Sequence, residues 1–169
     1  TAYHAGMIAK YAIEKWAKIP VDVEIASEFR YRDPIIDPST LIIAISQSGE
    51  TMDTLMAVRH AKAAGGRVLA ICNTNSSTIP RESDAVLYTH AGPEIAVAST
   101  KAFTAQVTVL SLIALALAHK KGSLSETRYR ELVQELSMIP EKIQLVLKSD
   151  VQIKHIAETF KDVRNFLYL

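Results

Sequence analysis

The sequence predicts an α/β fold, a doubly wound parallel sheet with helices on both faces. Residues 41–45, Leu-Ile-Ile-Ala-Ile, are apolar without alternation, which is typical of a parallel strand covered by helices on both sides. Segments with apolar residues at helical spacing separate this run from later apolar runs, so strand and helix alternate along the chain. This alternation is the pattern of an α/β layer.

In the first half of the chain, proline and glycine mark where the expected elements end. Pro20 stops a helical pattern, and residues 21–25 then alternate apolar and polar side chains as a half-buried strand near a sheet edge does. Gly65 and Gly66 stop a later helix. In chain order we expect a helix over 2–18, strands over 21–25 and 40–45, a helix over 52–64, a strand over 67–72, a short helical turn over 76–82 and a strand over 84–88.

The second half is expected to be helical up to a final strand. Its most apolar window, residues 103–119, contains several polar residues and falls short of the roughly 20 residues that a membrane-spanning helix needs. We therefore expect a buried or subunit-facing helix there. The predicted elements are helices over 100–120, 125–139, from Pro140 onward and over 150–160, and a strand over 165–169 that is cut at its end.

Composition and charge exclude several classes of protein. The chain has 169 residues, of which 49% are apolar, and we expect one globular domain. A net charge of +1 gives no electrostatic reason to expect nucleic acid or an anionic membrane as a partner. The single cysteine, Cys72, excludes an internal disulfide and suits a reducing compartment. With no secretion signal at the start of the sequence, we expect a cytoplasmic protein.

Metal and cofactor sites are not expected either. The five histidines are scattered, and none has a partner at metal-ligand spacing: His4, His60, His90, His119 and His155. The sequence contains neither the Gly-x-Gly-x-x-Gly motif of dinucleotide sites nor a phosphate loop that ends in Gly-Lys-Ser/Thr. The site is therefore expected to bind neither a dinucleotide nor a nucleoside triphosphate.

The most informative stretch is Ser-Gln-Ser-Gly-Glu-Thr, residues 46–51, directly after the central strand. In an open α/β sheet, ligands bind beyond the carboxyl ends of the strands, where loops lead into helix N-termini. A helix N-terminus attracts anions through its unpaired N–H groups and its dipole. Ser46, Ser48 and Thr51 add hydroxyl donors, Gln47 adds an amide, and Gly49 lets the backbone approach a ligand. A phosphate monoester is the natural ligand.

The alternative is that these hydroxyls only cap the following helix, because serine and threonine are favoured N-cap residues. One hydroxyl suffices for a cap, and the stretch has three together with an amide and a glycine. Glu50 and Asp53 flank the loop, and we assign them structural roles because a helix dipole favours acidic residues near its start.

A second stretch, residues 94–103, also runs from a loop into a helix N-terminus and is expected to lie beside the first loop. The alternative is that Ser99 or Thr100 only caps the helix, which would explain part of this stretch. Lys101, considered by itself, would be a solvated charge.

Three motifs together resemble one enzyme family. These are Ser-Gln-Ser-Gly-Glu-Thr-Met-Asp-Thr from Ser46, Val-Glu-Ile-Ala-Ser-Glu-Phe-Arg-Tyr-Arg from Val23, and Glu-Ile-Ala-Val-Ala-Ser-Thr-Lys-Ala-Phe from Glu94. They look like the isomerase half of the glutamine–fructose-6-phosphate aminotransferase (glucosamine-6-phosphate synthase) family, which is built from two sugar isomerase (SIS) domains. The resemblance covers essentially the whole chain. It implies a three-layer, flavodoxin-like SIS fold.

The resemblance also implies roles for individual residues. Ser46, Gln47, Ser48 and Thr51 would hold the phosphate of fructose 6-phosphate, while Thr1, Val97 and Ser99 would line the sugar end of the pocket. The opening Thr-Ala-Tyr resembles the end of the family's Cys-Gly-Thr-Ser-Tyr segment, and Ala2 stands where that family has serine, which removes one hydroxyl contact.

Domain organisation follows from the same resemblance. Residues 1–164 would form the first SIS domain without its first strand, and residues 165–169 would begin the next SIS domain. The family's catalytic glutamate, lysine and histidine lie in its second SIS domain and beyond, and its amidotransferase domain is a separate part. We therefore expect a fragment that binds a phosphosugar without turnover, partnered by the remaining domains and forming a homodimer through the apolar 103–119 helix. The alternatives are an SIS deglycase acting on fructosamine 6-phosphates and a phosphosugar-sensing regulatory SIS domain.

Overall fold

The computed structural model describes residues 1–95 and 99–167. Contacts divide the chain into two compact units, Thr1–Tyr129 and Arg130–Leu169. The assignment of residues 1–164 to one SIS domain and of 165–169 to the next stays a prediction.

The first unit is built on a parallel sheet of three strands in the order β1-β2-β3. The strands are β1 (Leu41–Ser46), β2 (Arg67–Cys72) and β3 (Ala85–Tyr88). Ser46 pairs with Cys72, and Cys72 pairs with Tyr88, so the carboxyl ends of all three strands lie at one edge of the sheet. This edge is where a ligand site is expected.

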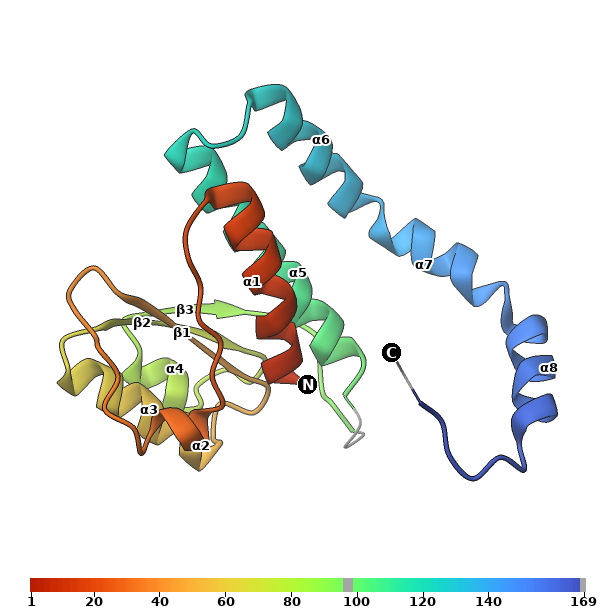
Figure 1. Cartoon of the computed structure of the whole chain (residues 1–169), viewed down its shortest axis with the longest axis horizontal. Coiled ribbons are helices and arrows are strands. Elements are labelled where there is room, and N and C mark those ends of the chain that lie inside the picture. The colour runs from red at the N-terminus through yellow and green to blue at the C-terminus, as the bar shows by residue number, and fades with distance from the viewer. Residues whose placement is uncertain (96–98, 168–169) are drawn as a thin grey trace. The chain divides into compact units, whose positions relative to one another are not determined.

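Helices cover both faces of this sheet (Figure 1). On one face lie α1 (Ala2–Ala17) and α5 (Lys101–Lys121), and on the other α2 (Ala26–Phe29), α3 (Met52–Ala63) and α4 (Thr78–Glu82). Successive strand side chains point to opposite faces, so Ile71 joins the core with α1 and α5, whereas Ala70 and Cys72 join the core with α3 and α4. The predicted fold class, α/β with helices on both faces, is confirmed.

Small residues let α1 and α5 pack closely. Ala5, Ala9 and Ala17 of α1 are buried in the same cluster as Ala114 and Ala118 of α5. The two helices run in the same direction, because the Lys121 ammonium near the end of α5 donates to the Lys18 carbonyl after α1, while both helix starts line one hollow.

The α5 helix is longer than the window that suggested it. Its 21 residues make it long and apolar enough to cross a membrane by length and composition, so the prediction that the segment is too short was wrong. A core helix passes the same test. Ala102, Gln106, Leu110, Ala114, Leu115 and Ala118 of α5 are buried, which confirms the expected packing role on that side of the helix.

The strand predicted over residues 21–25 is wrong. In the described residues this segment joins no sheet, and the Val21 N–H instead donates to Glu14 Oε1 at 3.2 Å. Val23 lies against Gly6 of α1, where an added Cβ would sit 3.1 Å from Val23 Cγ1. Packing on α1 half-buries Val21 and Val23 without a sheet, and Ile25, the next apolar residue of the pattern, is 51% exposed. The short α2 that follows was not predicted.

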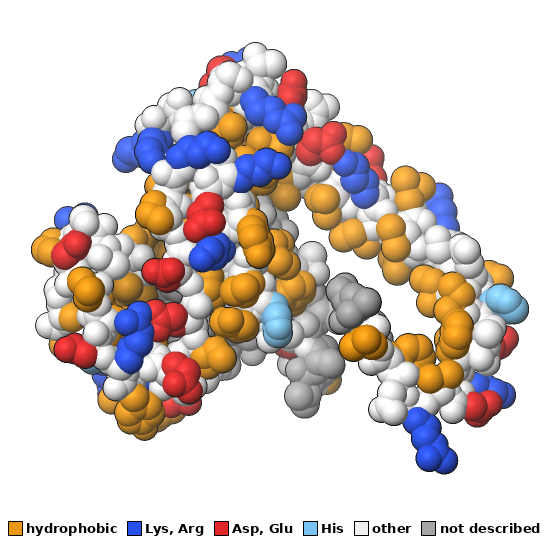
Figure 2. All heavy atoms as spheres, in the orientation of Figure 1, with side chains coloured by type: hydrophobic (Ala, Val, Ile, Leu, Met, Phe, Trp, Pro, Cys, Tyr) orange, Lys and Arg blue, Asp and Glu red, His pale blue; other side chains and the backbone are white. Residues whose placement is uncertain are grey.

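The second unit is helical. The helix α6 (Glu126–Ser137) begins in the first unit and ends in the second, followed by α7 (Ile139–Leu147) and α8 (Asp150–Phe160). None of the described residues in these three helices is buried, and Figure 2 shows hydrophobic side chains gathered along the helices of this unit. The strand predicted over 165–169 is absent over residues 165–167, and Tyr168 and Leu169 lie outside the described residues.

Candidate functional site

The loop after β1 folds back on its own serine. Ser46, the last residue of β1, is 3% exposed, and its Oγ accepts a hydrogen bond from the Gly49 N–H at 3.0 Å. The Thr51 Oγ1 lies 3.4 Å from the same oxygen. Gly49 has a φ of 69°, the left-handed conformation that glycine adopts without strain. The loop thus brings the hydroxyls of Ser46 and Thr51 together.

Among the described residues, the hydroxyls of Ser46, Ser48 and Thr51 use one proton, in the contact between Ser46 Oγ and Thr51 Oγ1, and the other two protons remain for donation. Ser48 Oγ accepts a hydrogen bond from the Glu50 N–H at 3.2 Å, as Ser46 Oγ does from Gly49. An oxygen that accepts from a backbone amide still has its own proton to donate. Thr51 is the N-cap residue of α3, but its side chain makes no capping hydrogen bond among the described residues. Capping therefore does not account for the three hydroxyls, although Ser46 and Ser48 do hold the loop in shape.

Asn73 joins the loops that follow the three strands. The Gln47 carbonyl accepts hydrogen bonds from the N–H of Asn73 at 3.1 Å and of Thr74 at 3.3 Å. The Asn73 side chain then bonds to the loop after β3: Oδ1 accepts from Thr89 Oγ1 at 3.1 Å and Ala91 N at 2.8 Å, and Nδ2 donates to Gly92 O at 2.7 Å. These bonds hold the rim of the sheet together.

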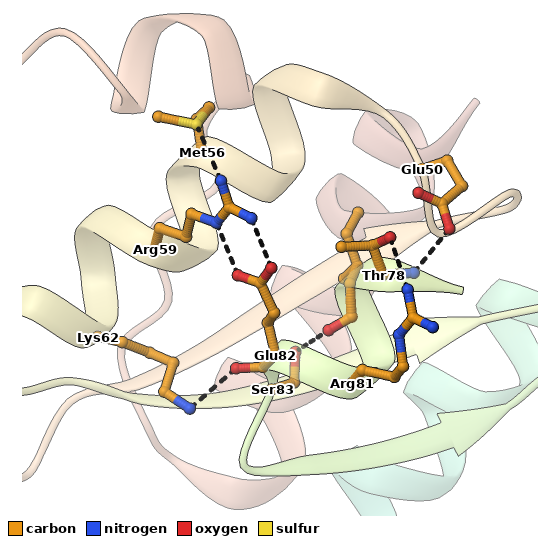
Figure 3. Close-up of polar contacts among 9 residues, drawn as sticks. Glu50, Met56, Arg59, Lys62, Thr78, Arg81, Glu82 and Ser83 are labelled. Carbon is orange, nitrogen blue, oxygen red and sulfur yellow. Dashed lines mark hydrogen bonds and ion pairs between the residues drawn. The ribbon is translucent and has the colours of Figure 1, made fainter. Parts of the chain in front are cut away.

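The two carboxylates in and after the loop bind to other elements of the fold. Glu50 Oε1 accepts a hydrogen bond from the Thr78 N–H at the start of α4, at 2.7 Å (Figure 3). Hydrogen bonding to Thr78 lowers the pKa of Glu50, and the nearby Arg81 charge adds to this effect. Asp53, in the first turn of α3, pairs with the Arg30 guanidinium at 3.0 Å. Both carboxylates make structural contacts, but Glu50 caps α4 and not the helix whose dipole we expected it to serve.

Thr1 and Ser99 line a separate hollow. It is open, measures about 340 Å³, and is lined by Thr1, His4, Ser99, Thr100, Phe103 and Thr104. Ser46, Gln47, Ser48 and Thr51 do not line it, so the described residues form two groups and not one pocket. Val97 lies outside the described residues. A larger open hollow of about 590 Å³, between α1 and residues 22–24, contains none of the predicted site residues.

Glu94 organises the start of α5. Its Oε2 accepts hydrogen bonds from Ser99 Oγ at 3.1 Å and from the Ala102 N–H at 3.3 Å, so it caps this helix. Thr100 is the N-cap residue, and Lys101 donates to the Pro93 carbonyl. Because Ser99 gives its proton to Glu94, its oxygen remains free to accept from a ligand.

His4, which we expected to be a surface or structural residue, is exposed and was not among the predicted site residues. It lies on the wall of the hollow with Thr1, one turn later along α1. That helical spacing from Thr1 was the signal available in the sequence.

Residues 1–116 match the sequence profile of the SIS domain. The chain belongs to the SIS domain family. The predicted family is therefore confirmed, and the matched range includes β1, β2, β3 and most of α5, together with both hydroxyl-bearing stretches of the SIS domain.

Relatives of this SIS domain carry names that fit the resemblance. It is 56% identical over 169 residues to "Glutamine--fructose-6-phosphate aminotransferase [isomerizing]" of Leifsonia xyli subsp. xyli, covering 100% of this chain and 27% of that protein. The C-terminal domain of glucosamine-fructose-6-phosphate aminotransferase from Francisella tularensis has a TM-score of 0.91 at 46% identity, over 95% of this chain and 46% of that one. Glucosamine-6-phosphate deaminase from Thermotoga maritima has a TM-score of 0.67 at 26% identity, over 82% of this chain and 41% of that one. The chain thus spans about a quarter of the length of the curated relative.

Proposed function

We propose that this chain is the fructose-6-phosphate-binding SIS domain of a glutamine–fructose-6-phosphate aminotransferase, the enzyme that makes glucosamine 6-phosphate from fructose 6-phosphate and glutamine. The observation that carries the proposal is the loop after β1, where Ser48 Oγ accepts from the Glu50 amide and keeps its own proton for a ligand, while Ser46 and Thr51 have one further proton between them.

In this proposal Ser46, Gln47, Ser48 and Thr51 hold the phosphate. A dianion at the N-terminus of the 12-residue α3 is attracted by the helix dipole and by unpaired N–H groups, so a lysine or arginine is not required. Each hydrogen bond to a charged phosphate oxygen contributes on the order of 1.5 to 3 kcal/mol before the costs of binding are subtracted. Because Ser48 is half-buried and Thr51 is exposed, a ligand can reach both.

The sugar end is proposed to contact Thr1, Val97 and Ser99. The Ser99 oxygen, whose proton goes to Glu94, would accept a hydrogen bond from a sugar hydroxyl. His4 in the same hollow offers a ring nitrogen as a further donor or acceptor.

Binding without turnover is proposed for the chain alone. The resemblance assigns the catalytic groups to a second SIS domain, and the chain covers 27% of its Leifsonia relative. We also propose that the chain works with the remaining domains as a homodimer, with the exposed side of α5, including Leu112, at the subunit contact. The buried free thiol of Cys72 supports a reducing, cytoplasmic location.

The names of the relatives favour the aminotransferase over the two alternatives, a fructosamine-6-phosphate deglycase and a phosphosugar sensor. The 56% identical relative is named as the aminotransferase across the full length of this chain. The phosphate loop itself would serve all three functions equally well.

Calorimetric titration tests the proposal. The chain should bind fructose 6-phosphate and show at least tenfold weaker affinity for fructose, because the phosphate supplies the charge-assisted bonds. Ser48→Ala should weaken binding of fructose 6-phosphate and leave that of fructose unchanged, whereas Ser125→Ala, far along the chain from the loop, should change neither. Equal affinities of the wild type for the two sugars would overturn the proposal.

A further inference from the structure

The N-terminus of α4 is capped by the loop that follows β1. A helix begins with N–H groups that its own turns cannot satisfy. In the five-residue α4, the first of these, on Thr78, donates to Glu50 Oε1 at 2.7 Å, and the second, on Ile79, donates to the Gly49 carbonyl at 2.9 Å. The third residue is Pro80, which has no N–H to satisfy. Two neighbouring loop residues therefore accept from both available donors of this first turn.

The residue that would ordinarily cap α4 does not do so. Ser77 is its N-cap, but its side chain makes no capping bond, and its Oγ donates to the Thr74 carbonyl at 2.9 Å. The serine is packed directly against Gly49, where an added Cβ would lie 2.0 Å from Ser77 Oγ. Because the local cap is turned away, α4 takes its cap from Glu50.

We infer that Glu50 is a positioning residue that fixes the phosphate-binding loop by capping α4. The inference rests on the proposed function. The Glu50 carboxylate and the Gly49 carbonyl bind the loop to α4. Ser48 directly precedes these two residues, inside the turn that the hydrogen bond from the Gly49 N–H to Ser46 Oγ closes. Loss of the Glu50 bond leaves the Ser48 hydroxyl on a less restrained segment, so binding a phosphate must then supply the ordering that the cap supplies beforehand.

A negative side chain beside a site for a dianion needs an explanation, and the cap provides it. The Glu50 charge is directed at the start of α4, where the Thr78 N–H and the helix dipole stabilise it, and Arg81 of α4 donates to the Thr78 hydroxyl on the same side (Figure 3). What the loop requires is therefore the acceptor oxygen at this place and not the negative charge. A glutamine keeps the oxygen and removes the repulsion.

Two variants at Glu50 separate these properties. Glu50→Ala should weaken the affinity for fructose 6-phosphate at least fivefold and speed amide hydrogen exchange at Thr78 and Ile79, as measured by calorimetry and NMR. Glu50→Gln should bind as tightly as the wild type, within twofold, or more tightly. Rescue by glutamine is the signature of a positioning acceptor, because a charge role would be lost in both variants.

Two further variants serve as a second route and as a control. Thr78→Pro removes the N–H that donates to Glu50, and proline is tolerated at the first position of a helix. This variant should weaken binding of fructose 6-phosphate at least fivefold, and it tests the inference even if Glu50→Ala fails to fold. Glu82→Ala removes the ion pair that joins α4 to Arg59 of α3 and leaves the loop of residues 46–51 unchanged (Figure 3). It should leave the affinity within twofold of the wild type.

The outcomes distinguish this inference from the proposed function. If the wild type prefers fructose 6-phosphate to fructose, and Glu50→Ala and Thr78→Pro speed the Thr78 or Ile79 region's exchange without weakening binding, the positioning role is wrong and the proposed function stands. An equal loss of affinity in Glu82→Ala would also overturn it, because the effect would then be general to α4. If the wild type does not prefer the phosphorylated sugar, the proposed function itself fails.

Discussion

Replacing Gly49 by alanine tests the close packing of the loop of residues 46–51 against Ser77. Gly49 has a φ of 69°, and alanine in the left-handed region costs about 1 to 2 kcal/mol. The new Cβ would also sit 2.0 Å from Ser77 Oγ and 2.7 Å from Ser77 Cβ. Relief requires breaking the Ser77–Thr74 hydrogen bond, which costs about 1 kcal/mol, and shifting backbone, for which overpacking costs about 1 to 3 kcal/mol. The free energy of unfolding should fall by about 3 to 6 kcal/mol in total.

Gly122→Ala is the matched control for this variant. Gly122 has a φ of 70°, and nothing lies within 4 Å of its added Cβ, so this variant should lose only the conformational part, about 1 to 2 kcal/mol. Urea unfolding followed by the fluorescence of Trp16, the single tryptophan of the chain, measures both variants within the first unit. Equal losses for the two variants would refute the argument that Ser77 packs against Gly49.

Two further predictions concern the cores. Burial, with a smaller effect of the Glu50 charge, raises the pKa of the Cys72 thiol to about 11. The protonated thiol therefore contributes its full stability to the folded state below the unfolded pKa of about 8.5, and this contribution is lost as the pH rises toward 11. The free energy of unfolding should therefore fall more steeply over this range in the wild type than in Cys72→Ala, and parallel curves would contradict the burial of the thiol. Gln106 is 2% exposed, and its Oε1 has no hydrogen-bond partner among the described residues, so Gln106→Leu should raise the free energy of unfolding by about 1 kcal/mol. Urea unfolding checks this, with Gln106→Ala as the comparison that opens a cavity, and a less stable leucine variant would contradict the reasoning.

Elements whose pattern had one physical cause could be predicted from the sequence. The strand β2 begins and ends at the predicted residues because it is apolar on both faces and a glycine pair precedes it. The strand prediction for residues 21–25 was wrong because alternating apolar residues can also pack on a helix: Val21 and Val23 are half-buried on α1 without joining a sheet.

The candidate site was predictable where chemistry depends on local sequence. The loop of residues 46–51 could be found because its hydroxyls follow an apolar strand and precede a helix. The role of Glu50 could not, because its partner Thr78 is 28 residues away and the bond exists only once α4 lies beside the loop. From local sequence we expected Glu50 to interact with the dipole of α3, which follows it, whereas in the folded chain Glu50 binds to the start of α4.

The bonds made by Asn73 carry a consequence for protein engineering. The Asn73 side chain and backbone amide join the loops that follow β1, β2 and β3, which are far apart in sequence. Transplanting only one of these loops from a homologue would break this junction unless the incoming segment offers matching donors and acceptors. Successful exchanges should transfer all three loops together, including the asparagine at the position of Asn73.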